Sequence, residues 1–195
     1  MKRRSLLGLG LLLTVVSLHA QRSSEWGFGT YRLESHRLQL NLLMPGFHYE
    51  FGLLPNLTVG AGVGLGLATP QEGYSLAPSY RAQSRYYTNL GRREDLGRNI
   101  TGNSGDYLAA TFSHFFTQWE LAGNMDNSGR DLVFFGPAYG WQRQYKGGWS
   151  LNVELGAGWY FSNRDPIGLG PSVHLNLGWN PFARKKQTPV FPLQD

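Results

Sequence analysis

Three side chains near the end of the chain have the types that acyl transfer requires. Ser172 and His174 are two residues apart, so a β-strand would carry both on one face. Glu154 has the same parity on the strand-like segment before them. A serine activated by a histidine, which a carboxylate orients, is the arrangement of enzymes that hydrolyse acyl esters. No nucleophile-elbow motif accompanies the set, so we interpret it first as a hydrogen-bond network inside a β-fold.

A second group of charged residues also has strand spacing. Arg81 and Arg85 share one face of an expected strand, and His48 and Glu50 share a face two strands earlier. The expected strand between them has a glycine face, which leaves Arg81 or Arg85 room to reach Glu50. A buried ion without a partner costs several kcal/mol. We therefore predict an interior polar network of paired charges, with these members: His48, Glu50, Arg81, Arg85, Glu154 and His174.

The elements that position these side chains are indicated by alternating residues. Four glycines at positions 60, 62, 64 and 66 alternate with Ala61, Val63, Leu65 and Leu67. Successive side chains of a strand point to opposite faces, so one face is aliphatic and the other is bare backbone. The segments 149–161 and 167–179 repeat this pattern, with apolar odd positions and even positions rich in Gly, Ser and Asn.

Turn residues divide the chain into about eight strand-like segments. These are 26–33, 38–53, 57–68, 79–90, 107–119, 132–145, 149–161 and 167–179. In 38–53 the apolar set changes from even to odd positions at Pro45-Gly46, which predicts a β-bulge there. The segments predict an all-β fold, an antiparallel up-and-down barrel with a polar, closed lumen.

The apolar face of this barrel is expected to point outward. A soluble barrel would show water a face rich in Lys, Glu and Thr, whereas these polar faces carry small residues that fit a narrow lumen. Four tryptophans extend the apolar face toward strand ends, where an interfacial girdle of a membrane barrel belongs: Trp141, Trp149, Trp159 and Trp179. Charged residues are only 16% of the chain and glycines number 26, which also favours a transmembrane barrel.

The ends of the chain predict export and a tail. Residues 1–20 have a basic start, a short apolar run and Ala20 at the expected cleavage site, the features of a cleaved signal peptide. The barrel is assigned to 21–180 and a C-terminal tail to 181–195. The net charge of +5 falls to +2 (5 − 3) when Lys2, Arg3 and Arg4 leave with the leader, so nucleic acid is not an expected partner. The chain has no cysteine, which excludes disulfides and thiolate metal sites.

Several short motifs carry a resemblance to a known group. They are Leu18-His19-Ala20-Gln21, Leu40-Asn41-Leu42-Leu43, Arg85-Tyr86-Tyr87, Arg92-Arg93, Asn103-Ser104-Gly105, Tyr107-Leu108-Ala109 and Gly136-Pro137-Ala138-Tyr139-Gly140. On these motifs the chain resembles small bacterial outer-membrane β-barrel proteins of the OmpA/OmpX size class. The resemblance covers nearly all of the mature chain. It implies the fold and an outer-membrane location, and it implies no catalytic residues.

The expected role is non-enzymatic. We predict a monomeric outer-membrane protein that contacts outer-membrane lipid and that binds an extracellular ligand or protein through the loops 69–78 and 122–131. No cofactor and no metal are expected. Two alternatives remain open: a lipid A or phospholipid hydrolase that uses Ser172, His174 and Glu154, and a soluble periplasmic barrel that binds a ligand inside.

Overall fold

The computed structural model describes residues 33–69, 73–124, 131–162 and 166–183, and nine β-strands of these residues form one antiparallel sheet. The elements are β1 (His36–Asn41), β2 (Gly46–Leu54), β3 (Leu57–Ala68), β4 (Ser75–Tyr87), α2 (Leu90–Asp95), η1 (Thr101–Asn103), β5 (Asp106–Phe115), η2 (Thr117–Trp119), β6 (Ala122–Gly123), β7 (Leu132–Gln144), η3 (Lys146–Gly148), β8 (Trp149–Ser162) and β9 (Pro166–Trp179). The predicted signal peptide 1–20, the segment 26–32 and the tail from 184 onward lie outside the described residues.

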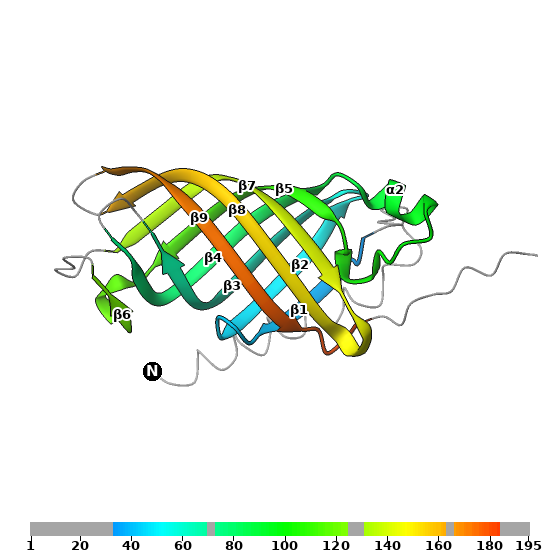
Figure 1. Ribbon diagram of the computed structural model, residues 1–195, viewed down its shortest axis with the longest axis horizontal. Helices are drawn as coiled ribbons and strands as arrows, with labels where there is room; N and C mark the ends of the chain where they lie inside the picture. The colour runs from blue at the N-terminus through cyan, green and yellow to red at the C-terminus, as the bar shows by residue number, and fades with distance from the viewer. Residues whose placement is uncertain (1–32, 70–72, 125–130, 163–165, 184–195) are drawn as a thin grey trace, which may run out of the picture.

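Eight of the strands close into a ring (Figure 1). Neighbours run β1-β2-β3-β4-β5-β7-β8-β9, and β9 pairs back with β1 through Leu40 opposite Trp179 and Asn41 opposite Gly178. We call the end of the ring that carries α2 and the β7–β8 turn the α2 end. The opposite end, which carries the two-residue strand β6, is called the β6 end.

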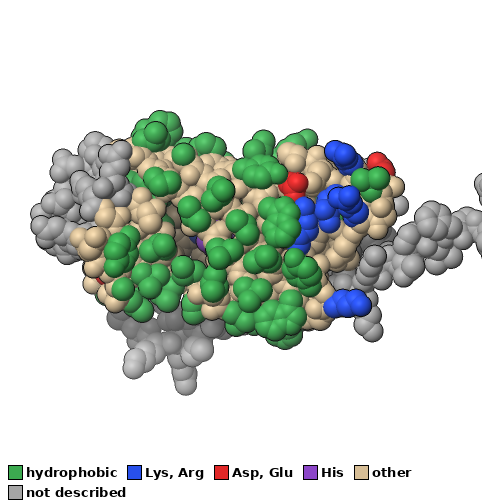
Figure 2. Space-filling model, in the orientation of Figure 1, with side chains coloured by type: hydrophobic (Ala, Val, Ile, Leu, Met, Phe, Trp, Pro, Cys, Tyr) green, Lys and Arg blue, Asp and Glu red, His purple; other side chains and the backbone are tan. Residues whose placement is uncertain are grey.

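The outer surface of the ring is apolar, and the middle of its inner surface is polar. On β8, Trp149, Leu155 and Trp159 are exposed, whereas Asn152 and Glu154 between them are buried. Figure 2 shows hydrophobic side chains spread over the strands, with Lys and Arg gathered at the α2 end. No helix among the described residues is long and apolar enough to span a membrane.

The predicted bulge at Pro45-Gly46 is wrong, because the segment 38–53 is two strands joined by a turn. β1 pairs with β2 from His36 opposite Phe51 to Asn41 opposite Gly46, and Leu42–Pro45 form the turn. Partners across an antiparallel pair point to the same face. Each even-numbered residue of β1 lies opposite an odd-numbered residue of β2. The apolar side chains therefore stay on one face although their numbering changes from even to odd at the turn.

Two of the predicted loops are partly strand. Within 69–78, Ser75 to Pro78 belong to β4 and pair with β3, as in Ala68 opposite Ser75. Within 122–131, Ala122 and Gly123 form β6, which pairs with the start of β4. Residues 75–78 pair with residues 65–68 of β3. Backbone hydrogen bonds to β3 therefore start β4 earlier than the turn-forming residue types in 69–78 suggest.

The chain between β4 and β5 folds over the α2 end of the ring. Asn103 of η1 is fully buried, and Gln142 Nε2 on β7 donates to the carbonyl oxygens of Gly102 (2.8 Å) and Asn103 (3.2 Å). The Glu34 N–H donates to Asn103 Oδ1 (2.8 Å). An apolar cluster lies beneath this segment: Leu33, Tyr87, Leu90, Tyr107, Ala109 and Ala138. This long connection therefore closes the α2 end of the ring.

The interior near the β6 end is apolar. Its buried side chains come from four different strands: Ala68, Phe115, Leu132, Phe134 and Tyr160. The rings of Phe134 and Tyr160 lie 4.9 Å apart. The polar residues of the interior are therefore held between an apolar cluster at each end.

Candidate functional site

Glu50 on β2 is the centre of the first group of polar contacts in the interior. Its carboxylate is fully buried and accepts hydrogen bonds from Thr58 Oγ1 and the Tyr87 hydroxyl, each at 2.7 Å. Two guanidiniums lie against the other oxygen, Oε2: Arg37 Nη1 at 3.3 Å and Arg85 Nη1 at 3.6 Å. Two hydroxyls and two cations thus compensate one buried charge, which is the condition for keeping it ionised away from water.

Glu154 on β8 is the centre of the second group. It forms an ion pair with Arg81 from β4, on the other side of the ring. Gln83 Nε2 donates to its two oxygens at 2.9 and 3.1 Å, and the Tyr107 hydroxyl donates to Oε2 at 2.9 Å. This carboxylate is therefore fully engaged in hydrogen bonds and an ion pair.

Two amide side chains join the two groups into one network. Gln83 Oε1 accepts from Arg85 Nη2 at 2.7 Å while its amide nitrogen binds Glu154. Gln142 Oε1 accepts from Arg85 Nη1 (3.1 Å) and from Asn152 Nδ2 (2.9 Å). The structure thus places four of the predicted network residues, Glu50, Arg81, Arg85 and Glu154, in contacts of this kind.

Arg37 and Gln142 were missed by the sequence reasoning. Arg37 lies one residue before the predicted strand 38–53, so the predicted boundary excludes it, whereas the structure has it inside β1. Gln142 has the even parity that points inward on β7, and this parity was the available signal. An uncharged amide gives a weaker signal than a charged side chain, because only buried charges require partners so strictly.

Each of the two predicted histidines has one buried ring nitrogen outside these hydrogen bonds. His48 Nε2 and His174 Nδ1 are buried and have no hydrogen-bond partner among the described residues. The glycine face of β3 makes room for His48, because a Cβ at Gly60 would lie 2.7 Å from His48 Nε2 and one at Gly62 would lie 3.0 Å from Nδ1. The alternating glycines thus allow a ring to pack flat against the strand.

Ser172, His174 and Glu154 lie close together without forming a catalytic relay. His174 is directly opposite Glu154 across β8 and β9, and Ser172 is opposite Gly156. Among the described residues no hydrogen bond joins Ser172 to His174, and His174 Nδ1 has no partner. The Glu154 carboxylate is held by Arg81 instead. A serine without a hydrogen-bonded base is not activated for attack on an ester.

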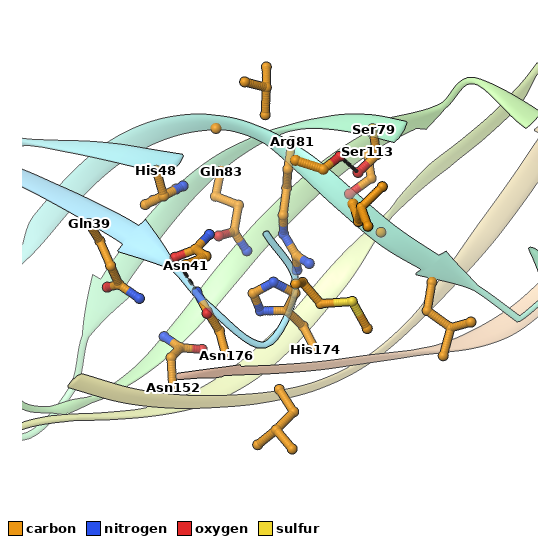
Figure 3. Close-up of a pocket in the computed structure, with 18 of the residues that line it drawn as sticks. Gln39, Asn41, His48, Ser79, Arg81, Gln83, Ser113, Asn152, His174 and Asn176 are labelled. Atoms are coloured by element: carbon orange, nitrogen blue, oxygen red, sulfur yellow. Dashed lines mark hydrogen bonds between the residues drawn. The ribbon is translucent and has the colours of Figure 1, made fainter. Parts of the chain in front are cut away.

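A cavity of about 170 Å³ lies beside the network and opens through the wall of the ring. Figure 3 shows Arg81 and His174 pointing toward each other inside it, with His48, Asn41 and Asn176 around the same space. Asn176 Nδ2 donates to Asn41 Oδ1 at 2.6 Å. The cavity holds on the order of ten water-sized volumes. It could therefore take a small polar group rather than a large ligand.

The predicted girdle residues divide unequally between the two ends of the ring. Trp149 begins β8 and Trp179 ends β9, both exposed at the α2 end, and Trp159 is exposed nearer the β6 end. Trp141 is half-buried, with the Arg143 guanidinium 4.6 Å from its ring centroid. Arg143 also pairs with Asp106 at 2.7 Å.

Burial and the nearby Arg143 charge lower the pKa of Arg93 on α2.

No family model, no curated protein and no solved structure matches this chain.

Proposed function

We propose that this protein is a monomeric transmembrane β-barrel of a bacterial outer membrane, with a non-enzymatic structural or surface-interaction role. The observation that carries the proposal is the distribution of side chains around the ring. Large apolar residues such as Leu108, Leu155 and Val173 are more than half exposed, whereas Arg37, Glu50 and Glu154 are buried inside. A soluble barrel has the reverse arrangement, with its apolar face inward.

Strand length supports the same proposal. A tilted strand needs about 9–11 residues to cross the hydrocarbon core of a bilayer. β2 has 9 residues, β5 has 10, and the strands β3, β4, β7, β8 and β9 have 12 to 14. Only β1, with 6 residues, is too short among the eight strands of the ring.

The filled interior favours a role other than conduction. The Glu50 and Glu154 networks cross the middle of the ring, and an apolar cluster lies at each end. Eight strands enclose a space that side chains fill. We therefore expect no ion conductance above background when the purified protein is added to a planar lipid bilayer.

The β6 end offers the surface for contact with a partner. Tyr74, Trp119 and Leu121 are exposed there, on segments that β6 and its pairing with β4 hold in place. Residues carried on a rigid scaffold are where recognition commonly occurs. The β6 end would face the cell exterior, and the α2 end, with two short turns and the folded connection between β4 and β5, would face the periplasm.

Heat modifiability of the protein in isolated membranes tests the barrel. A closed sheet in which every strand is paired resists dodecyl sulfate at room temperature and unfolds on boiling, so the two samples should migrate differently on a gel. Recovery of the protein in the soluble periplasmic fraction, with no shift on boiling, would refute the proposal.

Orientation can be tested with single thiols because the chain contains no cysteine. Leu121→Cys places a thiol at the β6 end, and Lys146→Cys places one in the exposed β7–β8 turn at the α2 end. A membrane-impermeant maleimide should label Leu121→Cys in intact cells, and Lys146→Cys only after lysis. The reverse labelling would place the α2 end outside.

A further inference from the structure

The described strands leave the wall of the ring incomplete between β3 and β9. The last pair of β2 with β3 is Gly46 opposite Gly64, and the last pair of β1 with β9 is Asn41 opposite Gly178. Beyond the turn Leu42–Pro45, β3 continues to Ala68, while β9 extends back to Pro166. Among the described residues no strand lies between these two edges. We call this gap the β3–β9 window.

The window has a defined frame. At its α2-end side, Leu42 N donates to Leu177 O and Leu65 N donates to Pro45 O, each at 2.9 Å, so the turn joins both strands. At its β6-end side, Thr69 Oγ1 donates to Pro171 O at 3.4 Å. Between these contacts the strand edges carry backbone groups that no paired strand satisfies. In a membrane such groups are tolerated where they border a polar cavity, and are costly against lipid.

The cavity described above opens through this window. Six of its apolar lining residues come from the turn, from β2 and from the two strand edges: Met44, Phe47, Leu65, Leu67, Val173 and Leu175. Its polar lining includes Arg81, His48 and His174. Figure 2 shows a hollow on this face with a histidine visible inside it. A molecule in the cavity would therefore meet polar groups inside and apolar groups at the opening.

Several buried polar atoms around the cavity have no partner within the part of the chain that the structure describes. They are His48 Nε2, Arg81 Nε, His174 Nδ1 and Asn176 Oδ1. Buried polar atoms are nearly always hydrogen-bonded, to protein, to ordered water or to a bound molecule. Because these four come from three strands and line one space, a single bound polar group could reach more than one of them.

The charge of the interior selects the kind of group. The inward-facing strand residues include three guanidiniums, on Arg37, Arg81 and Arg85. They face two carboxylates, on Glu50 and Glu154. Among these described strand residues the guanidiniums outnumber the carboxylates by one; a further buried carboxylate, on Glu34, lies outside the strands and accepts a hydrogen bond from the Gly102 N–H. Arg81 Nε lines the cavity without a partner and can only donate a hydrogen bond, and Arg85 lines the same cavity. A ligand that accepts hydrogen bonds and carries one negative charge therefore fits the site.

We infer that the β3–β9 window binds a single-chain carboxylate amphiphile. Its carboxylate lies in the cavity, where Arg81 Nε and His174 donate to it, and its alkyl chain leaves through the window between Leu67 and Val173. The small cavity accepts the head group, and the apolar outer surface of the ring accepts the chain. This inference rests on the proposed function, because the alkyl chain of the ligand needs lipid around the window.

Binding of dodecanoate to the purified full-length protein tests the inference. Native mass spectrometry in a non-ionic detergent is used, with dodecanol as the uncharged analogue of equal chain length. We expect one dodecanoate per protein and binding of dodecanol at least about tenfold weaker, since charge-assisted hydrogen bonds are the strong ones. Equal binding of the two, or binding of dodecyl phosphate alone, would overturn the carboxylate assignment.

Variants identify the site. Arg81→Gln with Glu154→Gln removes the ion pair as a unit and should abolish dodecanoate binding. The matched control, Arg143→Gln with Asp106→Asn, removes the pair at the α2 end and should bind normally. His174→Leu removes one orphaned donor and should weaken binding without loss of the heat shift. Unchanged binding both in Arg81→Gln with Glu154→Gln and in His174→Leu would overturn the inference.

Two matched substitutions to tryptophan test where the alkyl chain of the ligand leaves the cavity. Val173 on the window edge and Leu155, its partner across β8 and β9, are each 58% exposed. Val173→Trp should weaken dodecanoate binding, whereas Leu155→Trp should not. If dodecanoate binds only after residues 21–32 are removed, these residues are the occupant of the window, and the inference is overturned. A protein that shows the heat shift but binds no dodecanoate overturns this inference alone, and the proposed function stands.

Discussion

The guanidinium of Arg81 on β4 forms an ion pair with the carboxylate of Glu154 on β8, across the interior of the ring. The two residues are far apart in the sheet order, so the contact exists only because the sheet closes. The Glu154 side chain is 1% exposed and that of Arg81 is 16% exposed. Closure of the ring and burial of this charge are therefore coupled.

Removal of one member of this pair should cost more than removal of both. Arg81→Gln leaves Glu154 buried without its cation, and we expect a loss of about 3 kcal/mol in the free energy of unfolding. The double variant with Glu154→Gln should recover most of that loss, because no uncompensated charge remains. Urea unfolding of the protein in phosphatidylcholine vesicles measures both. Equal losses would mean that Glu154 is compensated without Arg81.

The Thr58 hydroxyl should contribute measurably to stability through Glu50. Thr58→Val keeps the shape of the side chain and removes the donor at 2.7 Å from a fully buried carboxylate, so we expect a loss of about 1.5–3 kcal/mol. Thr88→Val serves as the control, because its hydroxyl bonds a backbone carbonyl at an exposed position. A loss in Thr58→Val no larger than in the control would contradict the network.

Gly140 on β7 should not tolerate a side chain while Tyr107 keeps its position. A Cβ at residue 140 would meet the Tyr107 ring, whose hydroxyl donates to Glu154. We expect Gly140→Ala to destabilise the fold by about 1–3 kcal/mol, the range for overpacking. In a Tyr107→Ala background the same substitution should cost less. A cost independent of Tyr107 would point to the backbone instead.

Ser172→Ala should leave membrane lipids unchanged. The serine has no hydrogen-bonded base, so nothing activates it for attack on an ester. Mass spectrometry of lipid A and phospholipids from cells that overproduce the protein or the variant measures the effect. Lipids that lose acyl chains with the protein, but keep them with Ser172→Ala, would support a hydrolase instead.

Strand alternation was readable from the residues alone. The apolar positions of 149–161 and 167–179 identified the outward face, because strand geometry places every second side chain on the same side. The same rule brought Glu154 and His174 to the inward face before any pairing was known. It could not separate one long bulged strand from a hairpin in 38–53, since both explain the change of parity at Pro45.

What only the tertiary structure decided is which inward residues meet. Register across the closed sheet chose Arg81 as the partner of Glu154 and placed Arg37 beside Glu50, and no local pattern encodes register between strands so distant in sequence. The β3–β9 window depends on the same cause. It arises where the short β1–β2 hairpin meets two longer strands, a difference in length that becomes an opening only when the ring closes.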